Sequence, residues 1–385
     1  MTAILLAVAV VLFLLSLCAI VPPQTYMMWK LSIVTTEWGH FIAIVALVLF
    51  LISVFGKTRA ARAAAVFSVL AFLCGISSAA IALLWSRSLE RELVTAFGKA
   101  APRTMAGATV RQSPFTLRGL FSAPEAPEVR VATESFAQRG PGSLELDVYT
   151  REKSPAPAPI VMVLYSGSWR GGSKADQPQL NRYLASRGYV VIAPNYRLAP
   201  AFHFPAPTED VNDAIDFTKR NAARFGGDST RIVLIGRSAG GQLALQSAYT
   251  KRDPAIRGVV GIYAPSDQKW GWDHPTNQRV YKSFVSLSDF LNGDPKKVPE
   301  AYRASSPINF VDSSTVPTLL IHGSRDPLVS VVQSRRLDGA LIENHRKHLL
   351  VEMPWATHGC DYFFTGPCSQ VSTFAIERFI ADVTR

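Results

Sequence analysis

RIVLIGRSAGG, residues 231–241, decides the fold of this chain. RIVLIG predicts a buried strand, and Gly236, Ser238 and Gly240 follow it with the spacing G-x-S-x-G. A serine between a strand and a helix in this spacing sits on a sharp, strained turn with its hydroxyl at the top of the sheet. Small neighbours are needed there because other backbone passes close by. We therefore predict that Ser238 is a nucleophile and begins a helix, SAGGQLALQSAYT.

Other segments indicate a mostly parallel sheet. Four further apolar runs resemble strands that are buried on both faces; they are PIVMVLYS, GYVVIAPN, GVVGIYAP and TVPTLLIHG. Helical segments alternate with them, as in a doubly wound α/β fold. VRVATESF and SLELDVYT alternate in polarity and predict an antiparallel pair at the edge.

A serine hydroxyl needs a base, and the base needs an acid to orient it. In this architecture the acid and then the histidine follow the serine along the chain. Asp326 comes just after a predicted strand, and His358 lies 32 residues later in WATHGCDYF. We predict a triad of Ser238, Asp326 and His358. The rival side chains fit this order or position less well; they are His322, His345, His348, Asp338 and Asp361.

These segments resemble the α/β-hydrolase superfamily, specifically esterases and lipases of the hormone-sensitive-lipase and feruloyl-esterase-like (BD-FAE-like) groups. The resemblance rests on GYVVIAPNYRLAPAFHFPAPTEDVNDAI, FGGDSTRIVLIGRSAGG and LLIHGSRDPLVS, and it covers about residues 143–385. It implies an α/β-hydrolase domain over 128–385, with a possible cap at 266–304. Amidases and formamidases share these segments, so the resemblance is more specific for the fold than for the bond that is cleaved.

VLYSGSWRGGS, residues 163–173, aligns with a loop that begins with histidine and three glycines in these groups. Such a loop works through backbone N–H groups that hold the oxyanion of the tetrahedral intermediate. We expect the N–H groups of Gly167, Ser168 and Ala239 to form this oxyanion hole. Tyr165 replaces the usual histidine, and it would either brace the loop through its hydroxyl or only pack.

Aromatic residues near the predicted site are candidates for a substrate pocket. Tyr165 and Trp169 belong to the glycine loop, and Trp270 and Trp272 belong to the insertion KWGWDHPTNQRVYKSFVSLSDFLNG after the fifth core strand. Alternatively, the tryptophans of the insertion fill a small core of the cap itself.

Three apolar runs precede the hydrolase segments, at 3–21, 38–56 and 63–86. A membrane-spanning helix needs about 20 apolar residues, so we predict three transmembrane helices in a membrane region at 1–86. A cleaved signal peptide is the alternative for the first run, although it lacks a basic start. Residues 87–127 have the composition of a stalk or linker.

Basic residues set the predicted orientation. The short loop GKTRAAR at 56–62 holds Lys57, Arg59 and Arg62 and no acid, which places it in the cytoplasm. The catalytic domain would then lie on the extracytoplasmic side. There, Cys360 and Cys368 would form a disulfide; two free thiols are the alternative.

The remaining composition excludes some classes of function. The net charge of +11 is spread along the chain without a dense basic and aromatic block, so nucleic-acid binding is not indicated. No cysteine and histidine spacing suggests zinc, and the predicted chemistry needs no cofactor or metal. The apolar runs hold almost no ionisable residues, which disfavours a transporter.

The sequence thus predicts a membrane-anchored serine carboxylesterase that acts on small or lipid esters at a bilayer. An amidase, formamidase or peptidase would use the same triad. A catalytically silent, membrane-bound scaffold is the alternative of another class, favoured by the altered glycine loop. Oligomeric state has no signal in the sequence.

Overall fold

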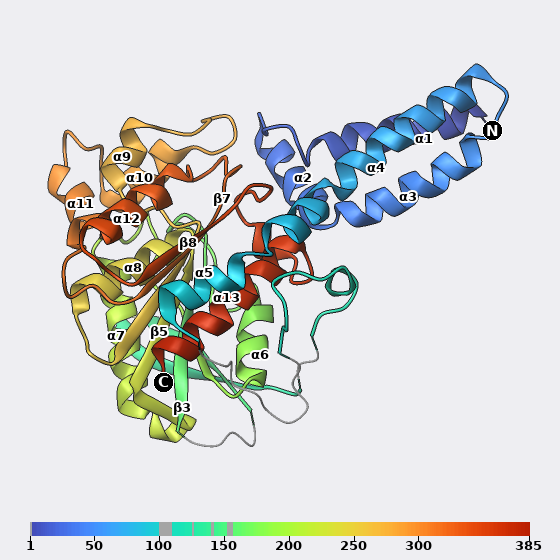
Figure 1. Ribbon diagram of the computed structural model, residues 1–385. Helices are drawn as coiled ribbons and strands as arrows, with labels where there is room; N and C mark the ends of the chain where they lie inside the picture. Colours follow the sequence, from blue (N-terminus) through green and yellow to red (C-terminus); the bar gives the residue numbers. More distant parts are fainter. Residues whose placement is uncertain (1, 100–109, 125–126, 140–141, 152–156) are drawn as a thin grey trace.

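The computed structural model describes residues 2–99, 110–124, 127–139, 142–151 and 157–385. An eight-stranded sheet forms its centre, in the order β1-β2-β4-β3-β5-β6-β7-β8 (Figure 1). The strands are β1 (Arg130–Arg139), β2 (Gly142–Thr150), β3 (Ala158–Leu164), β4 (Val190–Pro194), β5 (Gly227–Arg237), β6 (Ile256–Ile262), β7 (Thr318–Gly323) and β8 (His348–Met353). From β4 to β8 all neighbours pair in parallel, while β1–β2 and β2–β4 are antiparallel. The predicted α/β-hydrolase sheet and its antiparallel edge are therefore confirmed.

Helices cover both faces of this sheet. One face carries α5 (Leu89–Phe97), α6 (Pro178–Ser186) and α13 (Pro367–Val383). The opposite face carries α7 (Ala206–Asn221), α8 (Ala239–Lys251) and α12 (Val332–Glu343). The central strands β3 and β4 are buried at every residue, which explains their continuous apolar sequences.

Short helices between β6 and β7 form a cap over the carboxyl ends of the strands. They are α9 (Gln268–Asp273), α10 (Ser283–Leu291), α11 (Pro299–Ala304) and the 3-10 turn Pro307–Phe310. This segment, 268–310, overlaps the predicted cap at 266–304 and extends six residues beyond it. Inside it, Trp272 packs against the rings of Phe284 and Tyr302.

The described part of the predicted stalk packs on the α/β domain instead of standing free. Helix α5 has one apolar face, on which Leu89, Leu93 and Phe97 are buried, and the ring of Phe97 contacts Phe379 of α13. Phe115 belongs to the same buried cluster. Residues 100–109 and 125–126 of the predicted stalk lie outside the described residues. Helix α5 packs on the domain because its leucine and phenylalanine side chains lie on one face, and burying that face removes apolar surface from water.

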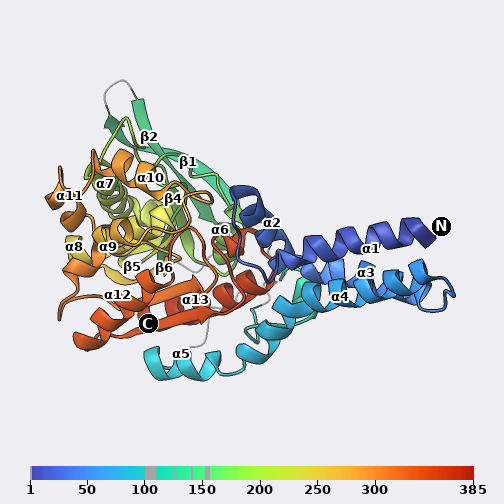
Figure 2. The same cartoon turned by 90° about the horizontal axis from the view of Figure 1, so that it is seen from above.

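Four helices precede α5: α1 (Thr2–Leu17), α2 (Tyr26–Glu37), α3 (Gly39–Ser53) and α4 (Arg59–Trp85). Figures 1 and 2 show α1, α3 and α4 side by side in a bundle that points away from the sheet, with α2 at its junction with the hydrolase domain. The chain start and the turn between α3 and α4 lie at the far end of this bundle.

The helix bundle buries small residues and exposes large apolar ones. Buried positions of α4 are alanine, serine and glycine throughout. The backbones of α3 and α4 pack tightly at Gly39 and Gly75, because a Cβ on Gly39 would lie 2.2 Å from the Gly75 carbonyl oxygen. Large apolar side chains lie on the outer surface; they include Ile4, Val11, Leu14, Ile44, Val48, Leu51, Ile52, Val66, Leu73 and Leu84.

The lengths of the N-terminal helices limit how many of the three predicted transmembrane helices could each cross a bilayer. Among the described residues, α4 is the single helix that is by itself long and apolar enough to cross a bilayer. Helices α2 and α3 meet the same criteria only as a pair, bent by 74°, and α1 is shorter. Length and composition therefore support one crossing, or two if the bent pair is one span. The number three stays a prediction.

Candidate active site

Ser238 occupies the sharp turn that the sequence predicts. It follows β5 directly and precedes α8, with φ 51° and ψ −119°. A Cβ on Gly236 would lie 2.0 Å from the Gly240 carbonyl oxygen, and a Cβ on Gly240 would lie 2.2 Å from the Tyr165 carbonyl oxygen. Both glycines are therefore required by close backbone packing, and Gly240 packs directly on the glycine loop.

Ser238, His358 and Asp326 form a continuous hydrogen-bonded series. The Oγ of Ser238 lies 3.0 Å from Nε2 of His358, and Nδ1 of His358 lies 2.6 Å from Oδ2 of Asp326. In neutral His358, Nδ1 donates to the carboxylate and Nε2 accepts the serine proton. The second carboxylate oxygen accepts from the backbone N–H groups of Leu328 and Val329. All three side chains are buried.

Burial raises the pKa of the Asp326 carboxyl, but the nearby imidazoles of His358 and His322 outweigh it and bring this pKa down to about 2. Asp326 is therefore an anion throughout the neutral range. An anion at this place fixes the tautomer of His358 and stabilises the imidazolium that forms during proton transfer.

His322 is a second histidine on the same carboxylate, which sequence reasoning assigned only to structural packing. Its Nε2 lies 3.0 Å from the Val329 carbonyl oxygen and 3.2 Å from Oδ2 of Asp326. Because Nε2 faces two acceptors, it carries a proton, and Nδ1 pairs with the hydroxyl of Ser334 at 2.7 Å. The sequence feature that could have indicated this contact is the spacing of four residues between His322 and Asp326.

The rival side chains of Asp338, His348 and Asp361 have partners other than Ser238. Asp338 faces His348 at 3.4 Å. Asp361 pairs with Arg237 and accepts the hydroxyl of Tyr263. The Tyr263 ring centroid lies 4.4 Å from that of His358. This buried group thus links the strand before the nucleophile to the loop that carries the histidine.

The glycine loop keeps three consecutive residues at positive φ, namely Gly167, Ser168 and Trp169. The carbonyl oxygen of Gly167 accepts from the N–H groups of Arg170 and Gly171. Within the described ranges, the N–H groups of Gly167, Ser168 and Ala239 donate to no protein acceptor. Unpaired donors beside the nucleophile are what an oxyanion hole requires.

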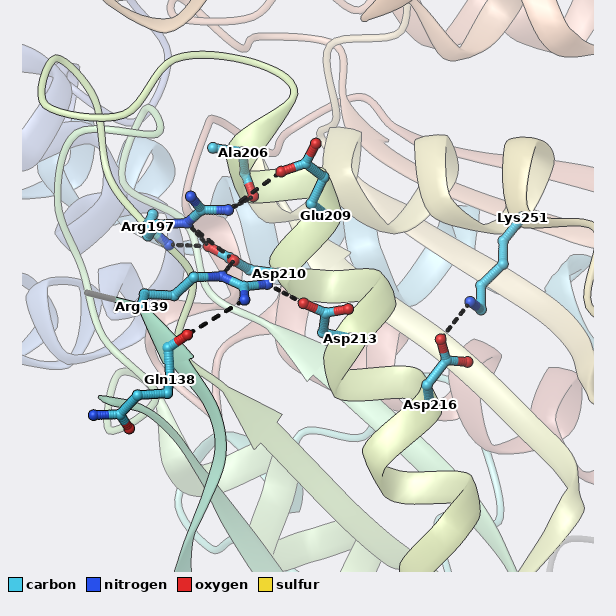
Figure 3. Close-up of polar contacts among 9 residues, drawn as sticks. All are labelled: Gln138, Arg139, Arg197, Ala206, Glu209, Asp210, Asp213, Asp216 and Lys251. Carbon is cyan, nitrogen blue, oxygen red and sulfur yellow. Dashed lines mark hydrogen bonds and ion pairs between the residues drawn. The ribbon is translucent and has the colours of Figure 1, made fainter. Parts of the chain in front are cut away.

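Tyr165 braces the loop. Its hydroxyl lies 3.3 Å from the Tyr196 carbonyl oxygen, and the Tyr196 hydroxyl donates to the Tyr165 carbonyl at 3.0 Å. Arg197, the next residue, is held in turn by Asp210 of α7, whose carboxylate accepts its backbone N–H and its Nε. Figure 3 shows this buried carboxylate between Arg197 and Arg139 of β1. The support of the loop thus extends to the far edge of the sheet.

A narrow cavity of about 50 Å³ opens on Ser238. It is lined by His358, Ser168 and Trp169 and by side chains of the cap and of the loop after β7, including Trp270, Tyr281, Leu287 and Leu328. Of the four predicted pocket residues, Trp169 and Trp270 line this cavity, while Tyr165 and Trp272 do not. The indole of Trp169 is fixed by Gln242 of α8 at 2.9 Å and by stacking on Phe290.

Two further features complete the site. Cys360 and Cys368 form a disulfide that closes the loop after His358. No group of three or more histidine, cysteine, aspartate or glutamate side chains suited to a metal ion occurs in the part of the chain that the structure describes.

Residues 146–341 match the BD-FAE family model, which is half of the chain. The chain belongs to the BD-FAE family. Esterase LipC of Mycobacterium tuberculosis is 34% identical over 258 residues, 62% of either chain. Esterase LipQ of the same organism is 29% identical over 296 residues, 71% of this chain and 69% of LipQ.

An esterase structure from Pyrobaculum calidifontis superposes with a TM-score of 0.58 and 25% identity, over 66% of this chain and 86% of that one. This BD-FAE chain therefore has the α/β-hydrolase fold of the esterase and lipase group, as the sequence predicts. It spans about three fifths of the length of LipC.

Proposed function

We propose that this chain is a serine carboxylesterase that works through an acyl-enzyme intermediate. The observation that carries the proposal is the hydrogen-bonded series from Ser238 through His358 to Asp326. His358 takes the proton of Ser238 as Oγ bonds to the ester carbonyl carbon. The protonated ring then gives that proton to the departing alcohol oxygen as the carbon–oxygen bond breaks. Water then bonds to the acyl carbon while His358 takes its proton. His358 returns a proton to Oγ of Ser238 as the acyl–serine bond breaks, which releases the carboxylic acid.

The unpaired N–H groups of Gly167, Ser168 and Ala239 supply the second requirement, stabilisation of the oxyanion. Each such donor is worth roughly 2.7–4 kcal/mol of transition-state stabilisation. The names of the relatives, esterases LipC and LipQ, support a carboxylic ester as substrate.

We further propose that α1, α3 and α4 lie in a membrane. A bundle in water would turn its large apolar side chains inward, whereas this bundle turns small residues inward and large ones outward. Small residues at the contacts are typical of helices packed in lipid. The turn between α3 and α4 lies at the far end of the bundle. It contains Lys57, and Arg59 follows it as the first residue of α4, which supports a cytoplasmic end there. The disulfide supports an extracytoplasmic hydrolase domain.

The catalytic proposal is tested with the full chain in detergent, since α5 packs on the hydrolase domain. Hydrolysis of p-nitrophenyl esters from C2 to C16 and labelling by a fluorophosphonate probe are measured. Ser238→Ala should abolish both. Ser247→Ala, on the same helix and also buried, is the matched control and should retain both. Labelling of the Ser238→Ala variant would contradict the assignment, and absence of labelling in the wild type would support a silent scaffold.

The same preparation separates ester from amide cleavage. Formyl-amine and anilide substrates are tested beside the esters, and turnover of the amides above that of the esters would replace the esterase by an amidase. For the topology, a reporter fused after residue 385 should be active only outside the cytoplasm. Cytoplasmic activity would overturn the proposed orientation.

A further inference from the structure

A second, larger cavity reaches the catalytic histidine. Its volume is about 570 Å³, on the order of ten times that of the cavity at Ser238. We name it the α2 cavity after the helix that forms one wall. Its lining includes Trp29, Ile33, Ser166, Tyr263, His358 and Tyr362. His358 is the residue that lines both cavities, whereas Ser238 lines the smaller one.

Helix α2 is fixed against the loop that carries His358. The indole Nε1 of Trp29 donates to the His358 carbonyl oxygen at 3.0 Å. The carboxylate of Glu37 accepts the backbone N–H of Cys368 at 3.0 Å. At the same end, the ring of Trp38 lies 4.1 Å from that of Phe363. The wall of the α2 cavity therefore belongs to the structure around His358, although it comes from the N-terminal region.

The reaction assigns the two halves of an ester to the two cavities. The acyl carbon must lie at Ser238, which bonds to it, while the alcohol oxygen must lie at His358, which protonates it. The α2 cavity borders His358 where the rings of Tyr263 and Trp29 lie 4.4 and 6.4 Å from the imidazole, so we infer that a group extending from His358 on this side enters it. The acyl group then occupies the smaller cavity, where about 50 Å³ leaves room for roughly three to five water-sized groups.

We propose that the α2 cavity binds the alcohol half of the substrate, and that the enzyme prefers a short acyl group joined to a large apolar alcohol. This inference rests on the esterase function proposed above. Trp29 and Ile33 supply the apolar part of a lining that also includes Asp176, Gln177 and Gln179. The same helix adjoins the bundle, whose outer surface is apolar, so an alcohol that partitions into a bilayer would reach the cavity from that side.

The test compares esters that differ in one half only. Hydrolysis of ethyl acetate, geranyl acetate and ethyl decanoate by the full chain in detergent is followed by acid release. The proposal expects kcat/KM for geranyl acetate to exceed that for ethyl decanoate at least tenfold. A preference for ethyl decanoate would overturn it, because the long chain would then lie on the acyl side.

A substitution in the wall gives a second, independent measurement. Ile33→Trp should fill the α2 cavity and lower the ratio of kcat/KM for geranyl acetate to that for ethyl acetate about tenfold, within the range for a changed apolar contact. Met27→Trp is the matched control, since Met27 is 62% exposed on the same helix, and its ratio should equal that of the wild type. An unchanged ratio in Ile33→Trp would overturn the proposal.

The two proposals fail in different ways. If Ser238 is required for ethyl acetate hydrolysis but the alcohol makes no difference, the assignment of the α2 cavity fails alone. If no ester is hydrolysed, or if Ser238→Ala retains full activity, the esterase function fails and the cavity assignment fails with it.

Discussion

The rings of Tyr165 and Tyr196 stack with their centroids 4.3 Å apart and their planes 6° from parallel. Each tyrosine hydroxyl lies within hydrogen-bonding distance of the other residue's backbone carbonyl. Where related loops begin with histidine, this chain therefore uses a tyrosine pair. Tyr165 is buried in the core on the face of the sheet that α7 and α8 cover, and it does not line the cavity at Ser238, so it orients the loop from behind.

Tyr196→Phe should slow turnover more than it destabilises the fold. Loss of one buried hydrogen bond costs about 1 kcal/mol of folding free energy. The freed carbonyl of Tyr165 lies beside Gly240 and at the base of the oxyanion loop, so we expect kcat to fall about tenfold. The measurements are kcat for p-nitrophenyl acetate and the melting temperature.

Tyr302→Phe is the control for that variant, because the Tyr302 hydroxyl also donates to a backbone carbonyl, that of Gly293, but within the cap. It should lower the melting temperature without the loss of kcat. Equal effects of the two variants on kcat would show that the tyrosine pair has no special role in positioning the loop.

Alanine should lower the activity at one glycine of this loop and leave it unchanged at another. Gly167 has φ 131°, and a Cβ there would lie 2.1 Å from the Gly171 carbonyl oxygen. Gly167→Ala should therefore displace the loop and lower kcat at least a hundredfold, the scale of one lost oxyanion donor. A Cβ on Gly171 meets nothing within 4 Å, so Gly171→Ala should keep its activity. Full activity in Gly167→Ala would place the oxyanion hole elsewhere.

Asp326 should give the folded protein an acid-sensitive contribution to stability. Its folded pKa of about 2 lies below the ordinary value of 3.8, so the carboxylate stabilises the fold above about pH 4. That contribution, about 2 kcal/mol, is lost as the pH falls towards 2. Asp326→Asn should remove this dependence between pH 4 and 2 in urea unfolding, and it should lower kcat on the order of 10⁴-fold through the wrong tautomer of His358. An unchanged acid dependence would mean that another carboxyl is responsible.

Local patterns in the sequence predicted the core of the fold and the three side chains of the proposed triad. The buried strands have continuous apolar runs, and the turn at Ser238 has its own glycine spacing, so neither needs information from distant residues. The chain order of serine, aspartate and histidine then singled out Asp326 and His358, which the structure brings together with Ser238.

The contacts that sequence reasoning missed join residues far apart in the chain. Trp29 and His358 are separated by 329 residues, and Arg237 and Asp361 by 124. No periodicity or spacing in the sequence indicates such pairs, because they form only when helices, strands and loops that are distant in the chain pack together. The packing of α5 was missed for a related reason: its apolar face is short, and the neighbouring proline- and alanine-rich segments resemble a linker.

The buried pair of Arg237 and Asp361 yields a last prediction. Both side chains are almost fully buried, and the Tyr263 hydroxyl also donates to the carboxylate. Removing one charge leaves the other buried without a counter-charge, which typically costs 3–5 kcal/mol, whereas removing both costs much less. Asp361→Asn should therefore lower the free energy of unfolding by about 3 kcal/mol, and the double variant Arg237→Met with Asp361→Asn should regain part of this loss.

Asp312→Asn breaks the pair of Arg252 and Asp312, whose side chains are both well exposed, and it should change stability by less than about 1 kcal/mol. Urea unfolding of the wild type and of the four variants, Arg237→Met alone included, in the same detergent measures all of these differences. If the double variant is less stable than Asp361→Asn by the full effect of Arg237→Met alone, the two side chains are not coupled. The charge pair would then add nothing to the contact between the strand before the nucleophile and the histidine loop.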